Sequence, residues 1–214
     1  NLLLGVIRDE ISVIGEKYGD DRRTQIGTDE EEIVDEDLIA DDENVIAMTN
    51  LGYIKRMSPD NFRQQNRGGR GIRGMQVIDD DYTTQLAHAK AKDNILFFTN
   101  QGRVYMIKVY EIPESSRTSR GTPVINLISM MGDEKVTAMV TQREMDNESL
   151  ILMATKNGTI KKTKGYEYRN VRKNGLMAIS LREDDELISV KNTLPGAEIL
   201  LISRKGSAIR FNEK

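Results

Sequence analysis

The chain has no cysteine and a single histidine among its 214 residues. The absence of cysteine excludes disulfide bonds and fits a protein of the reducing cytoplasm. Together with the lone histidine, it also leaves too few ligands for a structural zinc site. No apolar run reaches the roughly 18 residues of a membrane-spanning helix. The first residues show neither the basic lead nor the cleavage site of a signal peptide, so we expect a soluble protein with no membrane partner.

Acidic and basic residues nearly balance over the whole chain, with 34 Asp and Glu against 31 Lys and Arg. Their distribution is uneven. Residues 1–44 hold 15 acidic and 4 basic residues, which leaves 19 acidic and 27 basic residues in 45–214. The first part thus carries a formal charge of −11 and the second part +8. A basic domain behind an acidic lead favours an anionic partner, although solvated surface charge beside an acidic linker explains the same numbers.

Residues 1–18 show the periodicity of a helix. Apolar residues recur there at steps of three and four, as on one helical face: Leu3, Leu4, Ile7, Ile11, Ile14 and Tyr18. The next segment, 19–44, is rich in Asp and Glu and poor in aromatic residues, which is typical of an exposed linker. We therefore predict a short helix over 1–18, an acidic linker over 19–44 and a main domain over 45–214.

The main domain is internally repeated. Four times, an apolar run is followed by a turn that ends in glycine and by a strand that carries bases. Glycine suits the tip of such a β-hairpin because it accepts a positive φ angle. The four turn glycines recur at nearly regular intervals along the chain: Gly52, Gly102, Gly158 and Gly206.

Each complete repeat contains a second glycine, and further strands are predicted after it. Four strands in about 50 residues is the size of a propeller-type blade. Three blades are complete and a fourth stops after its first hairpin, so we expect the natural chain to continue, because an open toroid would leave exposed strand edges. The second glycines are Gly71, Gly121 and Gly175. Third strands are predicted at 122–127 and 176–179, and closing strands at 86–89, 136–140 and 187–190. The repeats span about 45–94, 95–149, 150–198 and 199–214.

Several stretches resemble the C-terminal part of the DNA gyrase A protein family. Residues 16–24 are similar to the end of the helical arm of its breakage-reunion domain, and 36–39 to the entry into its C-terminal domain. Residues 51–56, 97–105, 111–114 and 182–186 are similar to stretches of its blades. The most specific match is a seven-residue stretch that resembles the gyrase A box: Gln65, Asn66, Arg67, Gly68, Gly69, Arg70 and Gly71. Asn66 departs from the family, which usually has a basic residue there.

The resemblance implies an all-β fold, a propeller-like β-pinwheel of six four-stranded blades that exchange strands, of which about three and a half lie in this chain. It implies a basic rim that wraps double-stranded DNA without sequence specificity and enables ATP-dependent negative supercoiling. It implies a protein of the bacterial cytoplasm, associated with the nucleoid, that acts together with a second gyrase A chain and with the gyrase B protein. It places no catalytic residue, metal or cofactor in this chain, because the ATP and Mg²⁺ of the complete type II topoisomerase belong to other parts.

The residues around the box suit phosphate binding. Residues 53–73 contain six bases against one acid. Guanidinium groups form forked bonds to phosphate oxygens, and the glycines let the backbone approach the duplex and offer its N–H groups. We predict rim contacts, besides the box, from Lys55, Arg56, Arg63, Arg73, Arg103, Lys108, Arg117, Arg120, Lys161, Lys162, Lys164, Arg172 and Lys173, with Lys156, Arg204, Lys205 and Arg210 as further candidates.

Other functions remain open at this point. The C-terminal domain of the topoisomerase IV A protein has the same architecture, but its box is usually degraded. A propeller can also serve as a protein-interaction platform, and an Arg-Gly-Gly element can bind single-stranded RNA. The acidic clusters at 79–81 and 183–186 favour loops over metal sites, and His88 has no histidine at the corresponding place of the next two repeats.

Overall fold

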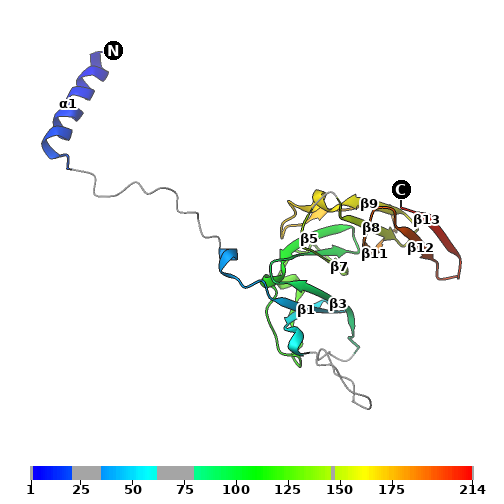
Figure 1. Cartoon of the computed structure of the whole chain (residues 1–214). Helices are drawn as coiled ribbons and strands as arrows, with labels where there is room; N and C mark the ends of the chain where they lie inside the picture. Colours follow the sequence, from blue (N-terminus) through cyan, green and yellow to red (C-terminus); the bar gives the residue numbers. More distant parts are fainter. Residues whose placement is uncertain (1, 21–34, 62–79, 146–147, 214) are drawn as a thin grey trace. The chain divides into compact units, whose positions relative to one another are not determined.

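The computed structural model describes residues 2–20, 35–61, 80–145 and 148–213 (Figure 1). The chain divides into two compact units, 1–35 and 36–214. The first unit contains the helix α1 (Leu2–Tyr18), as the apolar periodicity predicts. Its apolar side chains are exposed; Leu3, for example, is 73% exposed. None of the helices in the described part of the chain is long and apolar enough to cross a membrane.

The second unit consists of short strands joined by turns and 3-10 helices (Figure 1). The strands are β1 (Glu43–Thr49), β2 (Tyr53–Met57), β3 (Thr83–Lys90), β4 (Asn94–Thr99), β5 (Arg103–Lys108), β6 (Thr122–Pro123), β7 (Val136–Gln142), β8 (Leu150–Thr155), β9 (Ile160–Lys164), β10 (Leu176–Met177), β11 (Leu187–Thr193), β12 (Glu198–Ile202) and β13 (Ala208–Asn212). The 3-10 helices are η1 (Asp35–Leu38), η2 (Pro59–Asn61), η3 (Val109–Glu111), η4 (Val124–Asn126) and η5 (Gly165–Tyr168).

The sheets exchange strands between successive repeats. The first sheet has the order β3-β1-β2-β6, and the second has the order β10-β5-β4-β7. The strand β6 comes from the second repeat and β10 from the third, so each sheet is completed by the repeat that follows it. The third sheet, β11-β8-β9, has three strands, and β12 pairs with β13 in the fourth. This arrangement confirms the predicted pinwheel of four-stranded blades.

The exchanged strands are shorter than the sequence predicts. The strand predicted over 122–127 pairs with β2 only through Thr122 and Pro123. The Val124 amide then donates to the Gly52 carbonyl at 2.8 Å, and the chain turns into η4. Likewise, only Leu176 and Met177 of the predicted 176–179 pair with β5. Both segments leave the sheet because buried side chains such as Val124 and Ile179 turn into the core.

The hydrophobic cores lie between neighbouring sheets. One cluster joins the first and second sheets and includes Ile46, Phe97 and Val124. A second cluster joins the second and third sheets and includes Phe98 and Ile151. The closing strands β3, β7 and β11 contact one another in sequence. We call the opposite side of each sheet, formed by β2, β5, β9 and the exchanged segments, the outer edge.

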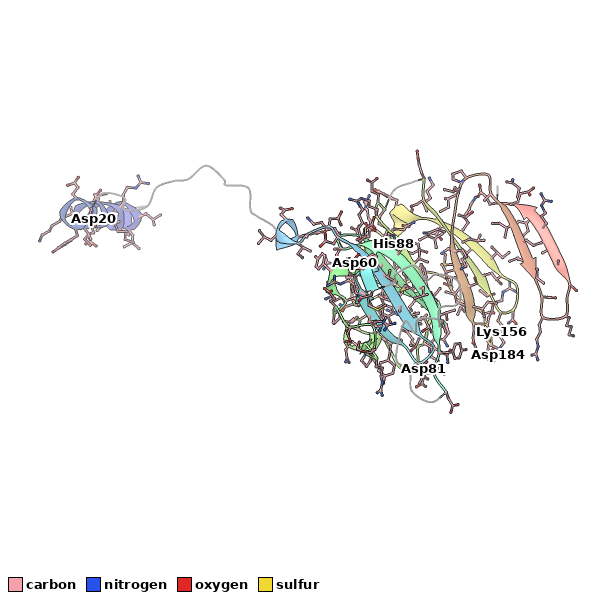
Figure 2. The ribbon with its side chains drawn as sticks, turned by 60° about the horizontal axis from the view of Figure 1, so that its bottom comes forward. Asp20, Asp60, Asp81, His88, Lys156 and Asp184 are labelled. Carbon is pink, nitrogen blue, oxygen red and sulfur yellow. The ribbon has the colours of Figure 1, made fainter. Side chains whose placement is uncertain are left out.

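Acidic residues before the closing strands hold the hairpin turns. Asp81 Oδ1 accepts hydrogen bonds from the amides of Leu51 and Tyr82. Asp185 Oδ1 accepts them from Asn157 and Glu186. Asp81, Lys156 and Asp184 lie toward the same end of the sheets, opposite His88 (Figure 2). The described residues of the two acidic clusters, 80–81 and 183–186, therefore lie in turns and loops, as expected, and Asp81 and Asp185 accept hydrogen bonds from backbone amides.

Part of the predicted acidic linker packs on the sheets. Glu36 lies 3.0 Å from the Lys108 ammonium. Asp41 accepts a hydrogen bond from the Lys92 amide and lies 3.0 Å from Arg143. The amide of Lys92 and the charge of Arg143 outweigh burial and hold the pKa of Asp41 below its usual value. The compact unit consequently begins at Glu36 rather than at residue 45.

Gly121 and Gly158 give a matched test of the strand exchange. Both have a φ of +87°, but a Cβ at Gly158 meets no atom within 4 Å, whereas one at Gly121 lies 2.5 Å from the Ile54 carbonyl oxygen. We expect Gly158→Ala to lower the free energy of unfolding by about 1 kcal/mol. Gly121→Ala should cost about 3 kcal/mol or more, because backbone strain and displacement of the exchanged segment add. Equal losses in urea unfolding would contradict the exchange.

The Asp185 turn predicts a pH dependence of stability. Burial raises the pKa of Asp185, but hydrogen bonds from the Thr155 side chain and from the Asn157 and Glu186 amides bring the pKa below the usual 3.8. A lowered folded-state pKa stabilises the protein above pH 3.8, and this contribution disappears as the pH falls further. Asp185→Asn should therefore lower the melting temperature at pH 7 and have a shrinking effect below about pH 4. A pH-independent difference in calorimetry would disagree.

Candidate nucleic-acid interface

The described rim candidates divide by what their side chains contact. The box residues 65–71, with Arg63 and Arg73, lie outside the described residues, so their prediction stays a prediction. Most of the remaining candidates come from β2, β5, β9 and the segments next to β6 and β10, on the outer edges of the sheets. The others lie elsewhere: Lys156, Arg204 and Lys205 are in hairpin turns, and Arg210 is in β13. Their exposure and partners decide which of them can reach a ligand.

Lys55 is not at the surface, in contrast to the prediction. It is completely buried, and its Nζ donates to the carbonyls of Ser116, Arg117 and Ser119 at 3.1, 2.7 and 3.0 Å. Burial lowers the pKa of the Lys55 ammonium, and the charge of Arg117 lowers it further. The number of bases between 53 and 73 favours a rim position for Lys55, but the sequence does not indicate which side of the strand faces the next repeat.

Arg56 also serves mainly inside the protein. Its side chain is only 18% exposed and lies 3.8 Å from Glu114. Its Nε donates to the Ile112 carbonyl and a terminal nitrogen donates to Asn44 Oδ1. The contacts with Ile112 and Glu114 tie β2 to the following repeat, and with the Asn44 bond they leave Arg56 little freedom to reach a phosphate.

Six further candidates are paired with carboxylates; among them, Lys156 lies 3.7 Å from Glu186 and Arg210 pairs with Glu198. Arg103 lies 3.5 Å from Glu134, and Lys108 lies 3.0 Å from Glu36. Lys162 pairs with Glu213, and Lys173 with Glu111. The carboxylates of Glu134 and Glu213 are buried, whereas the pairs with Glu36 and Glu111 are partly exposed. An exposed ion pair contributes only about 0–1 kcal/mol. These cations must nevertheless give up a carboxylate before they bind a phosphate.

Other cations have no carboxylate partner within the described ranges. The guanidinium of Arg120 lies 5.6 Å from the centre of the Tyr53 ring, a cation–π distance. Arg169, which was not among the predicted rim residues, stacks on the Tyr166 ring with its guanidinium carbon 3.7 Å from the ring centre. The sequence signal that could have identified Arg169 is its position shortly before Gly175, the second glycine of its repeat. The candidates in this group are Arg117, Arg120, Lys164 and Arg172.

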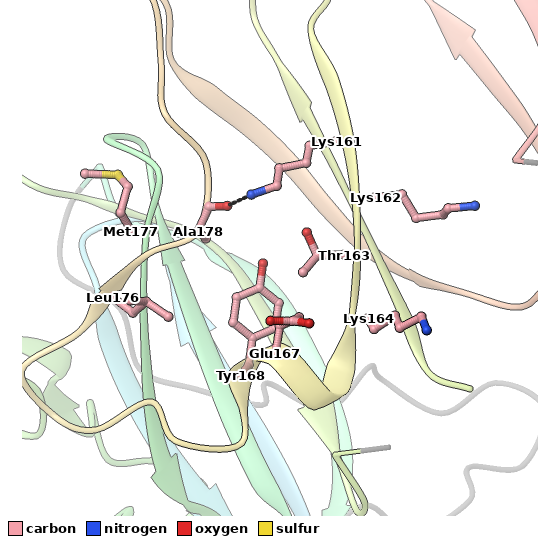
Figure 3. A pocket seen from close by; sticks show the side chains of 9 residues that line it. All are labelled: Lys161, Lys162, Thr163, Lys164, Glu167, Tyr168, Leu176, Met177 and Ala178. Carbon is pink, nitrogen blue, oxygen red and sulfur yellow. Dashed lines mark hydrogen bonds between the residues drawn. The ribbon is translucent and has the colours of Figure 1, made fainter. Parts of the chain in front are cut away.

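A hollow of about 410 Å³ lies beside the edge strand β9 (Figure 3). Lys161 points into it, and its Nζ donates to the Ala178 carbonyl at 2.6 Å. Lys162 and Lys164 point to the other side of the strand (Figure 3). Burial is the main cause that raises the pKa of the Tyr168 phenol at the base of the hollow, which keeps it neutral. Lys161 therefore has an internal partner, and Lys164 is the freer of these cations.

The described residues offer no metal centre: no three His, Asp or Glu side chains gather there as metal ligands. His88 lies 3.5 Å from Glu43 at an exposed position. The guanidinium and ammonium groups on the outer edges have the chemistry to bind anions.

Comparison with known proteins decides the family. A family model described as DNA gyrase C-terminal domain, beta-propeller, matches residues 43–87, 93–142, 149–193 and 197–214. The chain belongs to the DNA gyrase C-terminal domain family. The four matched stretches of this gyrase-family domain coincide with the four repeats.

Its relatives are longer proteins. The chain is 47% identical over 213 residues to the DNA gyrase A protein of Clostridium acetobutylicum, covering all of this chain and 26% of the relative. It is 43% identical over 214 residues to the DNA gyrase A protein of Staphylococcus epidermidis, covering 99% and 24%. The gyrase-family domain thus spans about a quarter of the length of these relatives.

Solved structures share the fold. A DNA gyrase A C-terminal domain matches with a TM-score of 0.65 and 23% identity, over 81% of this chain and 55% of the other. A C-terminal domain of DNA topoisomerase IV matches with a TM-score of 0.68 and 27% identity, over 82% and 53%.

The third repeat allows free and paired cations to be compared at equal charge. Lys164→Ala with Arg172→Ala removes two cations that have no carboxylate partner in the described part of the chain. Lys162→Ala with Lys173→Ala removes two that have one. Each phosphate contact adds about 0.9 to the slope of log K against log salt for duplex DNA. We expect the first pair to reduce the slope by about 1.8 and the second pair by less.

Fluorescence anisotropy of a labelled duplex, measured from low to high salt, provides the slopes. Unfolding curves of both variants identify any loss of structure. A larger slope change for the Lys162 and Lys173 pair would show that carboxylate pairing does not select the contacts.

Proposed function

We propose that this gyrase-family domain binds double-stranded DNA through its phosphates and bends it around the outer edges of its sheets. The main support is that cations without a carboxylate partner among the described residues lie on the outer edges of successive sheets. These cations are Arg117, Arg120, Lys164, Arg169 and Arg172. The part of the chain from residue 45 has a formal charge of +8, which favours a polyanion. Phosphate contacts position a protein on DNA but carry no sequence information, so we expect little sequence preference.

Bending requires several contacts along the rim. Curving 20–30 bp by 40–90° costs about 1–6 kcal/mol, which exceeds what one surface cation provides. Cations on consecutive outer edges divide this cost among several sheets. The box residues supply further contacts in the proposal: Arg67 and Arg70 bind phosphates, and the glycines admit the DNA backbone.

In the complete protein, the bent segment has a mechanical role. We propose that the complete gyrase A protein, working with a second copy of itself and with the gyrase B protein in the bacterial cytoplasm, uses the wrap to direct strand passage toward negative supercoiling. ATP and Mg²⁺ act on other parts of that assembly. The relatives from Clostridium acetobutylicum and Staphylococcus epidermidis are DNA gyrase A proteins, which supports this assignment.

A topoisomerase IV role is the second candidate. The solved topoisomerase IV domain has the higher of the two TM-scores, 0.68 against 0.65. The whole-length sequence similarity to gyrase A proteins and the nearly complete box favour the gyrase role.

A topology experiment tests wrapping directly. A nicked circular DNA is ligated in the presence of increasing amounts of the whole chain, and the linking number is read on gels after protein removal. Wrapping of one hand shifts the linking number in one direction, in proportion to the bound protein. We expect Arg67→Ala with Arg70→Ala to reduce the shift at equal occupancy, because the anchoring cations are lost.

The control is Lys135→Ala with Lys191→Ala, which removes equal charge from exposed positions beside and within the closing strands. This variant should keep the shift. Binding without a linking change would refute wrapping. Absence of duplex binding at low salt would favour a protein-interaction platform instead.

A further inference from the structure

A loop of the second repeat wraps around a side chain of the first sheet. Arg56 bridges Glu114 in a parallel arrangement, and Tyr53 and Ile54 pair with β6 in an antiparallel one. Between these two contacts the chain leaves β2 and returns to it over residues 115–121. We call this segment the exchange loop.

Lys55 occupies the centre of the exchange loop. An ammonium group has three donors, and the carbonyls of Ser116, Arg117 and Ser119 accept all three. Gly121 closes the loop so tightly that a Cβ there would lie 3.1 Å from Lys55 Cβ. The shape of the loop therefore depends on a charged group inside it.

The second sheet provides an internal contrast. Tyr105 stands three positions after Gly102, as Lys55 stands three positions after Gly52. Its phenol donates to Glu134 at 2.6 Å rather than to loop carbonyls. The segment that crosses this sheet runs from Gly158 to Gly175 and is shorter than the one from Gly102 to Gly121 that crosses the first sheet. The longer crossing segment thus occurs at the sheet that carries Lys55, and the shorter crossing segment at the sheet that carries Tyr105.

The exchange loop repeats the spacing of the box. Arg67 follows Gly52 by the same interval as Arg117 follows Gly102. The second arginine of each repeat, Arg70 or Arg120, likewise stands at a matching distance and directly precedes the second glycine. The exchange loop contains no acidic residue, and within the described chain neither of its guanidinium groups has a carboxylate partner. Its two cations are available to an anion.

We propose that the exchange loop is a second DNA-phosphate-binding element, equivalent to the box, and that Lys55 is the positioning residue that shapes it. This inference rests on the proposed function and names a site within it. Arg117 and Arg120 make the phosphate contacts, while the buried ammonium fixes the carbonyls between them. Lys55 itself does not touch DNA.

Salt-dependent binding of a labelled duplex by the whole chain tests the two arginines. Arg117→Ala with Arg120→Ala should lower the slope of log K against log salt by about 1.8. The charge-matched control, Lys135→Ala with Lys191→Ala, should leave the slope unchanged. An unchanged slope in the arginine variant would overturn the proposed element.

Lys55→Met tests the positioning role, with Lys55→Gln as a milder variant that keeps two donors. Each variant alone should lower the slope of log K against log salt. Added to the arginine pair, it should lower the slope no further than the arginine pair does by itself. Without DNA, trypsin should cleave after Arg117 and Arg120 about tenfold faster or more in Lys55→Met, because carbonyls lose their donors. Melting curves show that each variant is folded at the assay temperature.

Three outcomes separate the possibilities. In one outcome, Lys55→Met lowers the slope by about 0.9, this loss adds to the loss in the arginine variant, and trypsin cleavage is unchanged. This outcome would mean that Lys55 contacts DNA directly, and it would overturn the positioning role. An unchanged slope in folded Lys55 variants also overturns it. If the unmodified chain bound no duplex, the proposed function and the DNA element would both fall, whereas faster cleavage would still establish Lys55 as the organiser of the loop.

Discussion

The structure depends on how the outer strand of each sheet is paired, because a repeat by itself leaves the backbone donors and acceptors of that strand without a partner. In the first two sheets the following repeat provides this partner, through β6 on β2 and β10 on β5. The cores then form between the sheets instead of inside one repeat. Neighbouring repeats are consequently bound by hydrogen bonds and by apolar burial together, and the segments between them are held at the outer edge.

The same exchange decides which cations are structural and which are available. A side chain that faces the incoming segment becomes enclosed, as Lys55 and Tyr105 are, and must find partners there. A side chain on the incoming segment itself is less enclosed: Arg120 is exposed and Arg117 is half-buried. Bases on the strand and bases on the incoming segment therefore have opposite roles, and much of the positive surface charge arises from the connecting segments.

Acidic residues have a complementary role in this arrangement. Asp81 and Asp185 bind turn amides at the end of the hairpins. Glu36 and Asp41, in the acidic lead, bind groups of the first and second repeats. These carboxylates are engaged away from Arg117 and Arg120, so the outer edge keeps its positive charge although the whole chain is slightly acidic.

The sequence by itself determined the helix, the repeat, the hairpin turns with their glycines and the pinwheel class, because apolar periodicity and positive-φ glycines are local signals. It also placed the bases near the second glycines. Only the tertiary structure decided that the third strands are cut short after Pro123 and Met177, that Lys55 is buried and that Arg117 and Arg120 share one loop around it. These features depend on contacts between residues far apart in the sequence, as Lys55 and Ser119 are, where the burial and pairing of a side chain are set by the repeat that docks on it.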